Sequence, residues 1–342
     1  MGWLTAMNKM NVLITGATGF LGNNATCRLL AEGHQVTALG RNEAAGRRLA
    51  ASGARFVPID LAVMTPELAA PLFAGQQMVI HCAALSSPWG AYDDFYQANV
   101  IATENVVRSC RAAGVERLIH VSTPSVYFDF REQTGITENS PLPRRSANAY
   151  AHTKRLAEAV VDAAFAEGLP VVTLRPRALF GPGDTAIFPR LMRANERGFV
   201  PLIGGGQALM DLTYIDNVTE ALICCMRADA AVLGNKYNIT NGEPTSLFEL
   251  LQRIFGELGI PFRHRSIPYP LAYGAAGLME LGARMTQSRK EPLMTRYTVG
   301  TLAFSQTLDI SRAARDLHYR PQVTVEEGIR RFCSWWRSKG EL

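Results

Sequence analysis

The sequence predicts an α/β fold in which a doubly wound parallel sheet is accompanied by a second, smaller α+β domain. Three observations lead to this prediction. Short aliphatic runs alternate with longer helical patterns in the first half, a glycine-rich turn follows the first aliphatic run, and the rhythm of the sequence changes after Arg175. Helices must cover both faces of a parallel sheet, and the alternation supplies them.

Six runs in the first half have the length and the aliphatic or β-branched composition of buried strands. We expect these strands at Asn11–Thr15, Gln35–Leu39, Arg55–Ile59, Met78–His81, Arg117–Val121 and Val171–Arg175. Segments between them have 3.6-residue apolar spacing, which predicts helices at Phe20–Ala31, Phe95–Ala113 and Tyr150–Glu167. A glycine follows each helix, as is common where a helix ends: Gly33, Gly114 and Gly168.

The second half is organised differently. The segments LFGPGD, LIGGG and NGEP place Gly and Pro around shorter elements, which predicts a smaller domain that covers the substrate. Asp216–Met226 has the pattern of another helix of the large domain, so the two domains are interleaved in sequence. We expect a dinucleotide-binding domain over residues 8–178 that also receives about 208–236, and a substrate domain over residues 179–207 and 237–342.

The composition is that of a globular protein, with 47% hydrophobic and 19% charged residues in a chain of 342. The formal charge of +5 comes from scattered Lys and Arg, so we expect no nucleic-acid partner. The six cysteines form no CxxC pair and no metal-like cluster. We therefore expect them to be reduced core residues, with no bound metal.

No segment approaches the roughly 18 uninterrupted apolar residues of a membrane span. The nearest, Tyr269–Met285, is broken by Pro270, Glu280 and Arg284. We expect it to be a helix over the substrate pocket, with contact to a membrane surface as the alternative. The first apolar run at the N-terminus is already a strand, so we expect no signal peptide and a cytoplasmic protein.

A glycine run, Gly16, Gly19 and Gly22, follows the first expected strand and opens the first expected helix. Gly16 would make a tight turn, Gly19 would let the backbone approach a pyrophosphate, and Gly22 would let helix and strand pack closely. The phosphates would meet the N–H groups and the positive dipole end of the helix. The spacing differs from the standard GxGxxG. Its position between strand and helix nevertheless predicts a dinucleotide site in a Rossmann-type fold, with a turn without ligand as the alternative.

The residues after the second expected strand bear on which dinucleotide is bound. An acidic residue there binds the adenosine ribose of NAD, whereas an arginine accommodates the 2′-phosphate of NADP. This chain has Gly40 and Arg41 and no carboxylate. NADP(H) is therefore favoured, and NAD(H) is possible if Arg41 stacks on the adenine or faces solvent. We expect Asp60 and Leu61 beside the adenine and His81 as a satisfied core histidine.

Tyr150 and Lys154 are four positions apart, on one face of an expected helix. The reference pKa of a phenol is about 10, and both a neighbouring ammonium and an oxidised nicotinamide would lower it. A Tyr–Lys pair at this spacing is common on helices and is a weak signal alone. The fifth strand ends in Ser122 and Thr123. One of these hydroxyls could hold a substrate carbonyl beside Tyr150, and we expect at least one of them to cap the strand end.

These features together resemble the extended short-chain dehydrogenase/reductase superfamily of epimerase/dehydratase-like proteins. Further matches at VIHCAA, ANVIATENVV, LRPRALFGPGD, DLTYIDNV and YNITNGEP extend the resemblance over nearly the whole chain. It implies Thr123 rather than Ser122 as the third catalytic residue, a Lys154 that also holds the nicotinamide ribose, and an Asn99 that supports the helix near the active site. The full set expected at the cofactor is Gly16, Thr18, Gly19, Phe20, Leu21, Gly22, Arg41, Asp60, Leu61, Ala83, Ala84, Asn99, Tyr150, Lys154 and Pro176.

Two departures from the patterns of other superfamily members indicate which branch of the superfamily the chain resembles. Pro124 and Ser125 stand where sugar-nucleotide dehydratases carry an Asp–Glu pair, so 4,6-dehydratase activity is not expected. The acidic residue and the late RxGD segment that are usual in UDP-sugar epimerases are also missing from the sequence. Instead, Glu291 to Gly300 and the following FSQTLDISRAARDLHYRPQVTVEEGI are similar to the 3β-hydroxysteroid and sterol dehydrogenases and their bacterial β-keto-acid reductase relatives.

The sequence thus predicts an NAD(P)-dependent oxidoreductase that moves a hydride between nicotinamide and a secondary alcohol or ketone. The expected substrate is bulky and apolar, either steroid-like or a long-chain β-hydroxy or β-keto acid. Alternatives are a sugar-nucleotide epimerase and a regulator without catalysis, which would require a broken Tyr–Lys pair. The resemblance also implies a homodimer through the helix that begins at Tyr150. Apolar side chains are expected at the substrate, with core packing as the alternative: Met279, Leu281, Met285, Leu293 and Met294.

Overall fold

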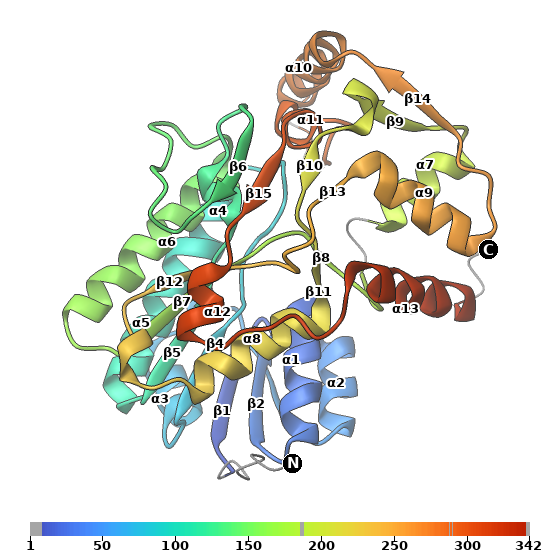
Figure 1. Cartoon of the computed structure of the whole chain (residues 1–342). Coiled ribbons are helices and arrows are strands. Elements are labelled where there is room, and N and C mark those ends of the chain that lie inside the picture. Colours follow the sequence, from blue (N-terminus) through green and yellow to red (C-terminus); the bar gives the residue numbers. More distant parts are fainter. Residues whose placement is uncertain (1–8, 185–187, 287, 289, 340–342) are drawn as a thin grey trace.

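A seven-stranded parallel sheet lies at the centre of the computed structural model, which describes residues 9–184, 188–286, 288 and 290–339 (Figure 1). The strand order is β12-β7-β5-β4-β1-β2-β3. Helices cover both faces, so the predicted doubly wound sheet is confirmed. The strands are β1 (Asn11–Thr15), β2 (Gln35–Gly40), β3 (Arg55–Pro58), β4 (Met78–His81), β5 (Arg117–Val121), β7 (Val171–Pro176) and β12 (Lys236–Ile239).

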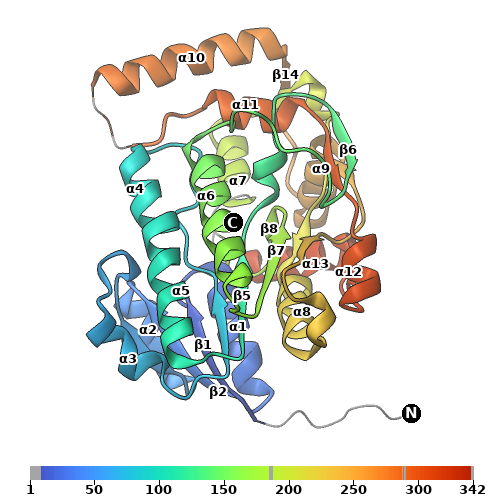
Figure 2. The same cartoon turned by 90° about the vertical axis from the view of Figure 1, so that its left-hand side faces the viewer.

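The helices divide between the two faces of the sheet (Figures 1 and 2). One face carries α1 (Phe20–Ala31), α2 (Glu43–Ala51) and α8 (Ile215–Arg227), and the other carries α3 (Pro66–Phe73), α5 (Ala102–Ala113) and α6 (Ala149–Ala166). Each helix buries an apolar stripe against the strands, and the two resulting cores are continuous layers on either side of the sheet. The layers hold the strand ends in fixed positions.

Six of the seven strands agree with the sequence prediction to within one residue at each end. The seventh, β12, was missed because its four residues, KYNI, contain no aliphatic run. The single helix predicted at Phe95–Ala113 is longer than expected and is not a regular α-helix throughout. It begins at Tyr92 as α4 (Tyr92–Tyr96) and passes through a π-helical segment, Gln97–Ile101, before α5. A π turn adds a residue to the helical repeat, which the apolar spacing did not reveal.

The rest of the chain forms smaller sheets and helices, which make up the predicted α+β part. A four-stranded sheet has the order β13-β10-β15-β6, with β6 (Gln133–Ile136), β10 (Leu209–Met210), β13 (Thr245–Ser246) and β15 (Gln306–Leu308). Two strand pairs join β8 (Leu179–Phe180) to β11 (Thr213–Tyr214) and β9 (Val200–Ile203) to β14 (His264–Ile267). The helices are α7 (Phe188–Glu196), α9 (Leu247–Leu258), α10 (Tyr269–Met285), α11 (Arg296–Ala303), α12 (Ser311–Asp316) and α13 (Val325–Ser338).

The strand pairings do not follow the expected domain boundaries. β6 lies within residues 8–178 but pairs with β15, and β10 lies within 208–236 but joins the same small sheet. β12 straddles the expected boundary at 237 and belongs to the large sheet through β7. The chain thus crosses between its two parts more often than the Gly/Pro punctuation indicates. Residues 8, 185–187, 287, 289 and 340–342 of the expected domains lie outside the described residues, and so do residues 1–8, on which the expected absence of a signal peptide rests.

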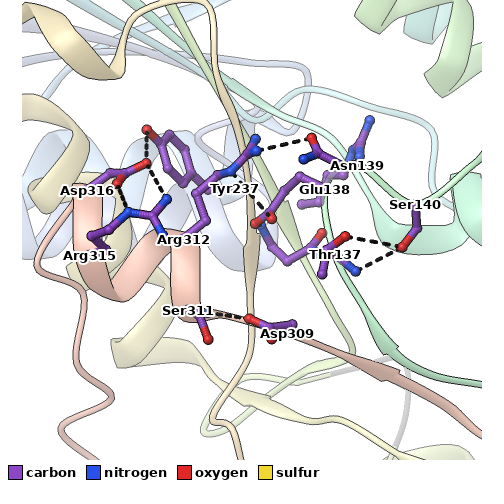
Figure 3. A network of polar contacts seen from close by, with 12 residues as sticks. Thr137, Glu138, Asn139, Ser140, Tyr237, Asp309, Ser311, Arg312, Arg315 and Asp316 are labelled. Carbon is purple, nitrogen blue, oxygen red and sulfur yellow. Dashed lines mark hydrogen bonds and ion pairs between the residues drawn. The ribbon is translucent and has the colours of Figure 1, made fainter.

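A polar network joins the loop after β6 to β12 and α12 (Figure 3). Arg312 Nη2 donates to Asn139 Oδ1 over 3.1 Å, and its Nε lies 3.8 Å from Glu138 Oε2. Glu138 also accepts from the backbone N–H of Asn238 over 2.8 Å. These contacts fix the small sheet against the edge strand of the large one, so the two parts hold the site between them in a defined geometry.

All six cysteines are free thiols. Cys110, Cys225 and Cys333 are buried as expected, but Cys27 is exposed because it lies on the outer side of α1. Among the described residues there is no group of three or more His, Cys, Asp or Glu side chains that could hold a metal ion. Within the same part of the chain, no helix combines the length and apolar character needed to cross a membrane.

Candidate active site

The predicted site residues gather where the parallel strands end. β1 and β4 end side by side, with Thr15 opposite His81, and β5 and β7 continue the same edge. Ligands of open α/β sheets bind beyond this edge. The loops there carry the glycine run after β1, Ala83 and Ala84 after β4, Thr123 after β5, and Pro176 at the end of β7.

The glycine run has the geometry of a phosphate cradle. Gly16 has a φ of +67°, and a Cβ on it would lie 2.7 Å from the backbone of Ala83. A Cβ on Gly22 would lie 2.3 Å from the carbonyl oxygen of Gly16. Gly19 caps α1 without a side-chain acceptor, and the first turn holds no acidic residue. The N–H groups and dipole of α1 are therefore presented to an anion such as a pyrophosphate. Pyrophosphate binding by Gly19 stays a prediction.

The other residues of this turn differ in what their side chains contact. Thr18 packs against the end of β2, because a Cβ on Gly40 would lie 2.6 Å from Thr18 Oγ1. Phe20 lies next to Gly183, whose added Cβ would be 3.6 Å from the Phe20 ring. The Leu21 side chain is buried in the core. Leu21 could therefore meet a cofactor only through its backbone.

Arg41 lies beyond Gly40, where the adenosine half of a dinucleotide is expected. Its Nη1 is 3.7 Å from Asp60 Oδ2, and both side chains are largely exposed. Asp60 Oδ1 accepts from the Ala62 N–H over 3.0 Å and caps the short turn that contains Leu61. An exposed ion pair of this kind contributes little to stability, so the guanidinium can turn to a ligand phosphate at small cost.

Asn99, which lies in the π-helical segment, fastens the loop after β4 to α6. Its Oδ1 accepts from the Leu85 N–H over 2.7 Å, and its Nδ2 donates to the Leu85 carbonyl over 3.2 Å and to Thr153 Oγ1 over 3.0 Å. The side chain is fully buried and its amide is occupied by these partners. Asn99 therefore links the loop after β4 to α6, and both its support of the active-site helix and its contact with the cofactor stay predictions.

His81 is the satisfied core histidine that the sequence predicts. Its Nδ1 lies 2.7 Å from Thr15 Oγ1, and its Nε2 lies 3.0 Å from Thr103 Oγ1. Burial, and to a smaller extent the charge of Lys154, lowers the pKa of His81 to about 3. The ring is neutral at physiological pH and supports the end of β4.

Tyr150 stands at the start of α6, where Asn148 caps the helix by accepting from the Ala151 N–H over 2.8 Å. Tyr150 is half-buried, and its phenol interacts with the side chains of Ser86 and Thr123. Burial raises the pKa of Tyr150, and these two interactions offset the increase only in part. Thr123 is thus the strand-end hydroxyl beside Tyr150.

The buried ammonium of Lys154 is held by the carbonyl oxygen of Val121 at 2.8 Å. Burial lowers the pKa of Lys154 to about 8, although the charge of Glu158 acts in the opposite direction. The sequence predicts that this ammonium lowers the pKa of Tyr150. In the structure the pKa of Tyr150 is instead raised, because the burial of the phenol prevails.

Ser122, the other candidate for the third residue, belongs to a buried ionic cluster beneath the site. Its hydroxyl donates to Glu158 Oε1 over 2.5 Å, and Arg175 Nε donates to the same oxygen over 2.8 Å. Arg175 also donates to the hydroxyl of Tyr127. Burial opposes ionisation of Glu158, but the Arg175 contacts outweigh it and lower the pKa of the carboxyl. Ser122 is thus engaged by Glu158, whereas Thr123 Oγ1 accepts from the Ser125 N–H over 3.2 Å and caps the short turn after β5. The capping that we expected of at least one of the two hydroxyls is therefore found at Thr123.

Two hydroxyls that sequence reasoning did not assign to the site extend it on the substrate side. Thr123 Oγ1 donates to Ser125 Oγ over 3.1 Å, and the Tyr297 hydroxyl donates to the same oxygen over 2.9 Å. The sequence distinguishes Ser125 only because it is not a carboxylate. No local pattern points to Tyr297, because it reaches Ser125 through the folding of α11 onto the large sheet. Ser86, which contacts Tyr150, was missed for the same reason.

A cleft of about 720 Å³ adjoins this set of hydroxyls, since Tyr297 lines it. The loop after β4, the start of α6, α10 and α11 form its walls. A volume of this size suits a medium-sized organic molecule. The larger side chains that line it are Trp89, Phe95, Phe130, Tyr273, Arg284, Arg296 and Tyr297.

The apolar side chains expected at the substrate do not line this cleft. α10 instead presents Tyr273, Glu280 and Ala283 to it, which recur at intervals of whole helical turns. Met294 packs beside buried residues of α10 and α11. The expectation was wrong because the apolar residues occupy the other side of α10 and the loop beyond it, where they are exposed: Met279, Leu281, Met285 and Leu293.

Comparison with known proteins now places the chain. A family model described as "NAD dependent epimerase/dehydratase family" matches residues 12–240, which is more than half of the sequence. The chain belongs to this family. Its glycine cradle, its Tyr–Lys pair and the hydroxyl of Thr123 thus lie in a fold whose family is defined by a nicotinamide cofactor.

Curated relatives match over almost the full length. The chain is 38% identical to "2-alkyl-3-oxoalkanoate reductase" of Stenotrophomonas maltophilia, covering 94% of this chain and 98% of that protein. It is 30% identical to the decarboxylating "Sterol-4-alpha-carboxylate 3-dehydrogenase" of Mus musculus, over 93% and 88%. A solved structure, "MoeE5 in complex with UDP-glucuronic acid and NAD", is similar with a TM-score of 0.75 and 25% identity, over 96% and 99%. The predicted superfamily and the prediction of an oxidoreductase are confirmed.

Proposed function

We propose that this protein uses NADPH to reduce the ketone of a bulky apolar substrate, of the β-keto-acid or steroid class, to a secondary alcohol. The observation that carries the proposal is the position of Tyr150, which follows Asn148 and Ala149 in the wall of the cleft and whose phenol interacts with the side chains of Ser86 and Thr123. The similarity to a 2-alkyl-3-oxoalkanoate reductase and to a sterol dehydrogenase supports the substrate class.

The residues around Tyr150 suit proton donation to a carbonyl oxygen. When bound, a reduced nicotinamide dinucleotide supplies a hydride to the carbonyl carbon. The raised pKa of Tyr150 keeps its phenol protonated at neutral pH, which is the form that donates. Once the proton has left, the side chains of Ser86 and Thr123 favour the phenolate, because their interactions with Tyr150 lower its pKa. Thr123 also lies where it can orient the substrate oxygen.

The residues at the strand ends fit a nicotinamide dinucleotide. A side chain at Gly16 or Gly22 would collide with backbone, so the turn keeps the close geometry that a pyrophosphate needs. Lys154 would hold the nicotinamide ribose, and the anchoring of its ammonium at the end of β5 supports this role. Arg41 would bind the 2′-phosphate of NADPH. The Kd values of NADPH and NADH test this preference, and tighter binding of NADH would contradict it.

A matched pair of variants isolates the role of Arg41. Arg41→Ala should weaken NADPH binding about tenfold and leave NADH binding nearly unchanged, because only NADPH carries the extra phosphate. Arg47, which is also exposed and pairs only with Glu43 on α2, provides the control as Arg47→Ala. Isothermal titration with both dinucleotides gives the four affinities. An equal loss for NADPH and NADH in Arg41→Ala would assign Arg41 to the adenine instead.

The cleft combines aromatic surface with the charged side chains of Asp94, Glu280, Arg284 and Arg296. Trp89, Phe130 and Tyr273 contribute aromatic surface, and the Arg284 guanidinium carbon lies 5.8 Å from the centre of the Trp89 ring. Pro124 and Ser125 replace the carboxylates of an elimination site, and Ser125 is occupied by Tyr297. We therefore favour reduction over sugar-nucleotide chemistry.

The remaining assignments are also proposals. α5 and α6 lie side by side on one face of the sheet, which is the pair of helices that a four-helix dimer interface requires. We propose a homodimer through these helices, which size-exclusion chromatography with light scattering would detect. The free thiols support a reducing compartment such as the cytoplasm. The division into a dinucleotide-binding and a substrate-binding domain stands as a proposal, with β12 assigned to the first.

The decisive experiment measures NADPH oxidation against a panel of ketones. The panel should contain long-chain β-keto acids, 3-ketosteroids and small water-soluble ketones, together with UDP-glucuronic acid as a test for the epimerase alternative. We expect turnover to increase with the apolar bulk of the ketone and no conversion of the sugar nucleotide. Epimerisation of UDP-glucuronic acid without net NADPH consumption would overturn the proposal.

A further inference from the structure

The outward side of α10 is an apolar surface on an otherwise ordinary exterior. It consists of side chains that are between 38% and 78% exposed, and we call it the apolar face: Leu271, Leu278, Met279, Leu281 and Met285. Four of these residues follow one another at intervals of seven, three and four positions, which keeps them on one side of the helix. Figure 2 shows α10 lying across the top of the molecule, above α4, α6 and α11.

The inward side of the same helix holds its only carboxylate. Ala272 and Ala276 are buried, and so is the carboxylate of Glu280. Glu280 accepts from the Arg296 N–H over 2.7 Å and from Arg296 Nε over 2.8 Å. A surface helix of a globular protein usually buries its apolar side and exposes its charges. α10 does the opposite, which marks its outward side as a contact surface.

Cations stand at both ends of the apolar face. Arg263 and Arg265, just before and within β14, precede α10, and Lys290 follows it, all with exposed side chains. In the sequence from residue 259 to 290, Glu280 is the only Asp or Glu, and it is neutralised by Arg296. The surface therefore combines an apolar centre with positive ends.

This combination selects one kind of partner. A second copy of the chain would bring the same positive ends together, which repels. An anionic phospholipid surface offers negative headgroups to the cations and acyl chains to the leucines. We propose that α10 docks this protein on anionic phospholipid membranes, lying in the plane of the interface with the apolar face among the upper acyl chains.

The position of α10 next to the substrate cleft relates membrane docking to substrate access. Tyr273, Glu280 and Ala283 on its inward side line the substrate cleft, so a single helix separates the cleft from the docked surface. A substrate that partitions into lipid would reach the cleft beside this helix without crossing water. This last step rests on the proposed reduction of an apolar ketone, whereas the docking itself does not.

Vesicle flotation with the full chain tests the docking. Wild-type protein is mixed with vesicles of phosphatidylcholine alone or of phosphatidylcholine and phosphatidylglycerol in equal parts. We expect flotation with the anionic vesicles, much less with the neutral ones, and weakening by salt. Leu278→Glu should bind the anionic vesicles at least about tenfold more weakly, because a leucine that docking would bury in the membrane is replaced by a charge that the headgroups repel.

Two further variants test whether the loss of flotation is specific to the apolar face and to the cations at its ends. Leu68→Glu is the matched control, since Leu68 on α3 is also a half-exposed leucine, and it should float like the wild type. Arg263→Glu with Lys290→Glu changes only exposed side chains and should also abolish flotation. Thermal melting must show that each variant is folded.

Three results would overturn the proposal: no flotation of the wild type with anionic vesicles, equal flotation with neutral ones, or an equal loss in Leu68→Glu. A dimer that dissociates in Leu278→Glu without lipid would assign the apolar face to a second copy instead. Flotation does not depend on turnover. Failure of the ketone panel would therefore leave the docking intact, and loss of flotation would leave the reduction of a water-soluble ketone unchanged.

Discussion

The base of the active site and the outer side of α10 reverse the usual distribution of side chains in opposite ways. Beneath the site, Lys154, Glu158 and Arg175 are buried charges. On α10, Leu271 and Leu278 are exposed leucines. Charges inside and leucines outside are each unfavourable unless another contact compensates.

The compensation differs between the two regions. Each buried charge has a partner within the chain: Val121 for Lys154, and Glu158 with Arg175 for one another. The exposed leucines are compensated only if something outside the chain covers them. Buried charges that find partners within the chain support the chemistry of the site. Exposed apolar side chains that find no cover within the chain indicate a binding partner. The following predictions test that distinction.

The largest effect is expected at Tyr150. Tyr150→Phe removes the proton donor but keeps the ring, so turnover with the best ketone should fall by about a thousandfold. The unfolding temperature should change little, because the hydroxyl is the only group lost. Initial rates of NADPH oxidation and a thermal melt measure both quantities. Unchanged turnover would mean that Tyr150 does not donate the proton.

The buried ion pair should be the next most sensitive position. Glu158→Ala leaves Arg175 buried without its partner, which should lower the free energy of unfolding by about 3 to 5 kcal/mol. Asp162 on the same helix pairs with Lys236 at 2.6 Å but is half exposed. Asp162→Ala should therefore cost less than about 1 kcal/mol. Urea unfolding of the three proteins gives the comparison, and similar losses in both variants would remove the distinction between buried and exposed pairs.

Asp211 is a buried carboxylate with incomplete compensation, and it sharpens the contrast with Glu158. It accepts from the Leu308 N–H over 2.6 Å, while its other oxygen has no hydrogen-bond partner among the described residues. Burial raises the pKa of Asp211 from 3.8 to about 6, although the Leu308 hydrogen bond and the charge of Arg177 oppose this. The carboxyl therefore favours the fold below about pH 4, and this contribution is lost as the pH rises through 6.

Asp211→Asn should remove that pH dependence. At pH 7.5 the variant should be more stable than the wild type by roughly 2 kcal/mol, since the amide stays neutral and can still accept from Leu308. Denaturant unfolding between pH 4 and pH 8 measures the difference. A wild-type stability that does not decrease between pH 4 and 7 would contradict the raised pKa of Asp211.

The smallest effect on stability is expected on α10. Leu278→Glu should change the free energy of unfolding by less than about 0.5 kcal/mol, because the side chain is 72% exposed and loses few contacts. Its reduction of a water-soluble ketone should equal that of the wild type. A loss of several kcal/mol would show that Leu278 is compensated within the chain and that the apolar face needs no outside partner.

The cofactor half was predictable from the sequence because its elements are local. The strand that ends at Thr15, the glycine run and the helix from Phe20 follow one another directly, and each carries its own signal. Tyr150 and Lys154 are one helical turn apart, so their common face could also be predicted. The choice of Thr123 over Ser122 came from the resemblance, and the contacts of Ser122 with Glu158 agree with it.

The substrate half was less predictable because its contacts join distant segments. Tyr297 reaches Ser125 across more than half of the chain, and no local pattern signals that approach. The apolar residues of α10 indicated a pocket, but a helix has two sides, and the sequence does not say which one faces the cleft. The pKa of Tyr150 depends on burial by surrounding elements, so the four-residue spacing to Lys154 could not predict its direction.

Isotope transfer tests the proposed reduction most directly. The protein is given a long-chain β-keto ester and NADPH deuterated at the nicotinamide C4 on one face and then on the other, and the alcohol is examined by mass spectrometry. We expect one deuterium on the carbinol carbon from one of the two cofactors only, and almost no product from Tyr150→Phe. An alcohol without deuterium from either cofactor, or equal product from Tyr150→Phe, would contradict hydride transfer at this site.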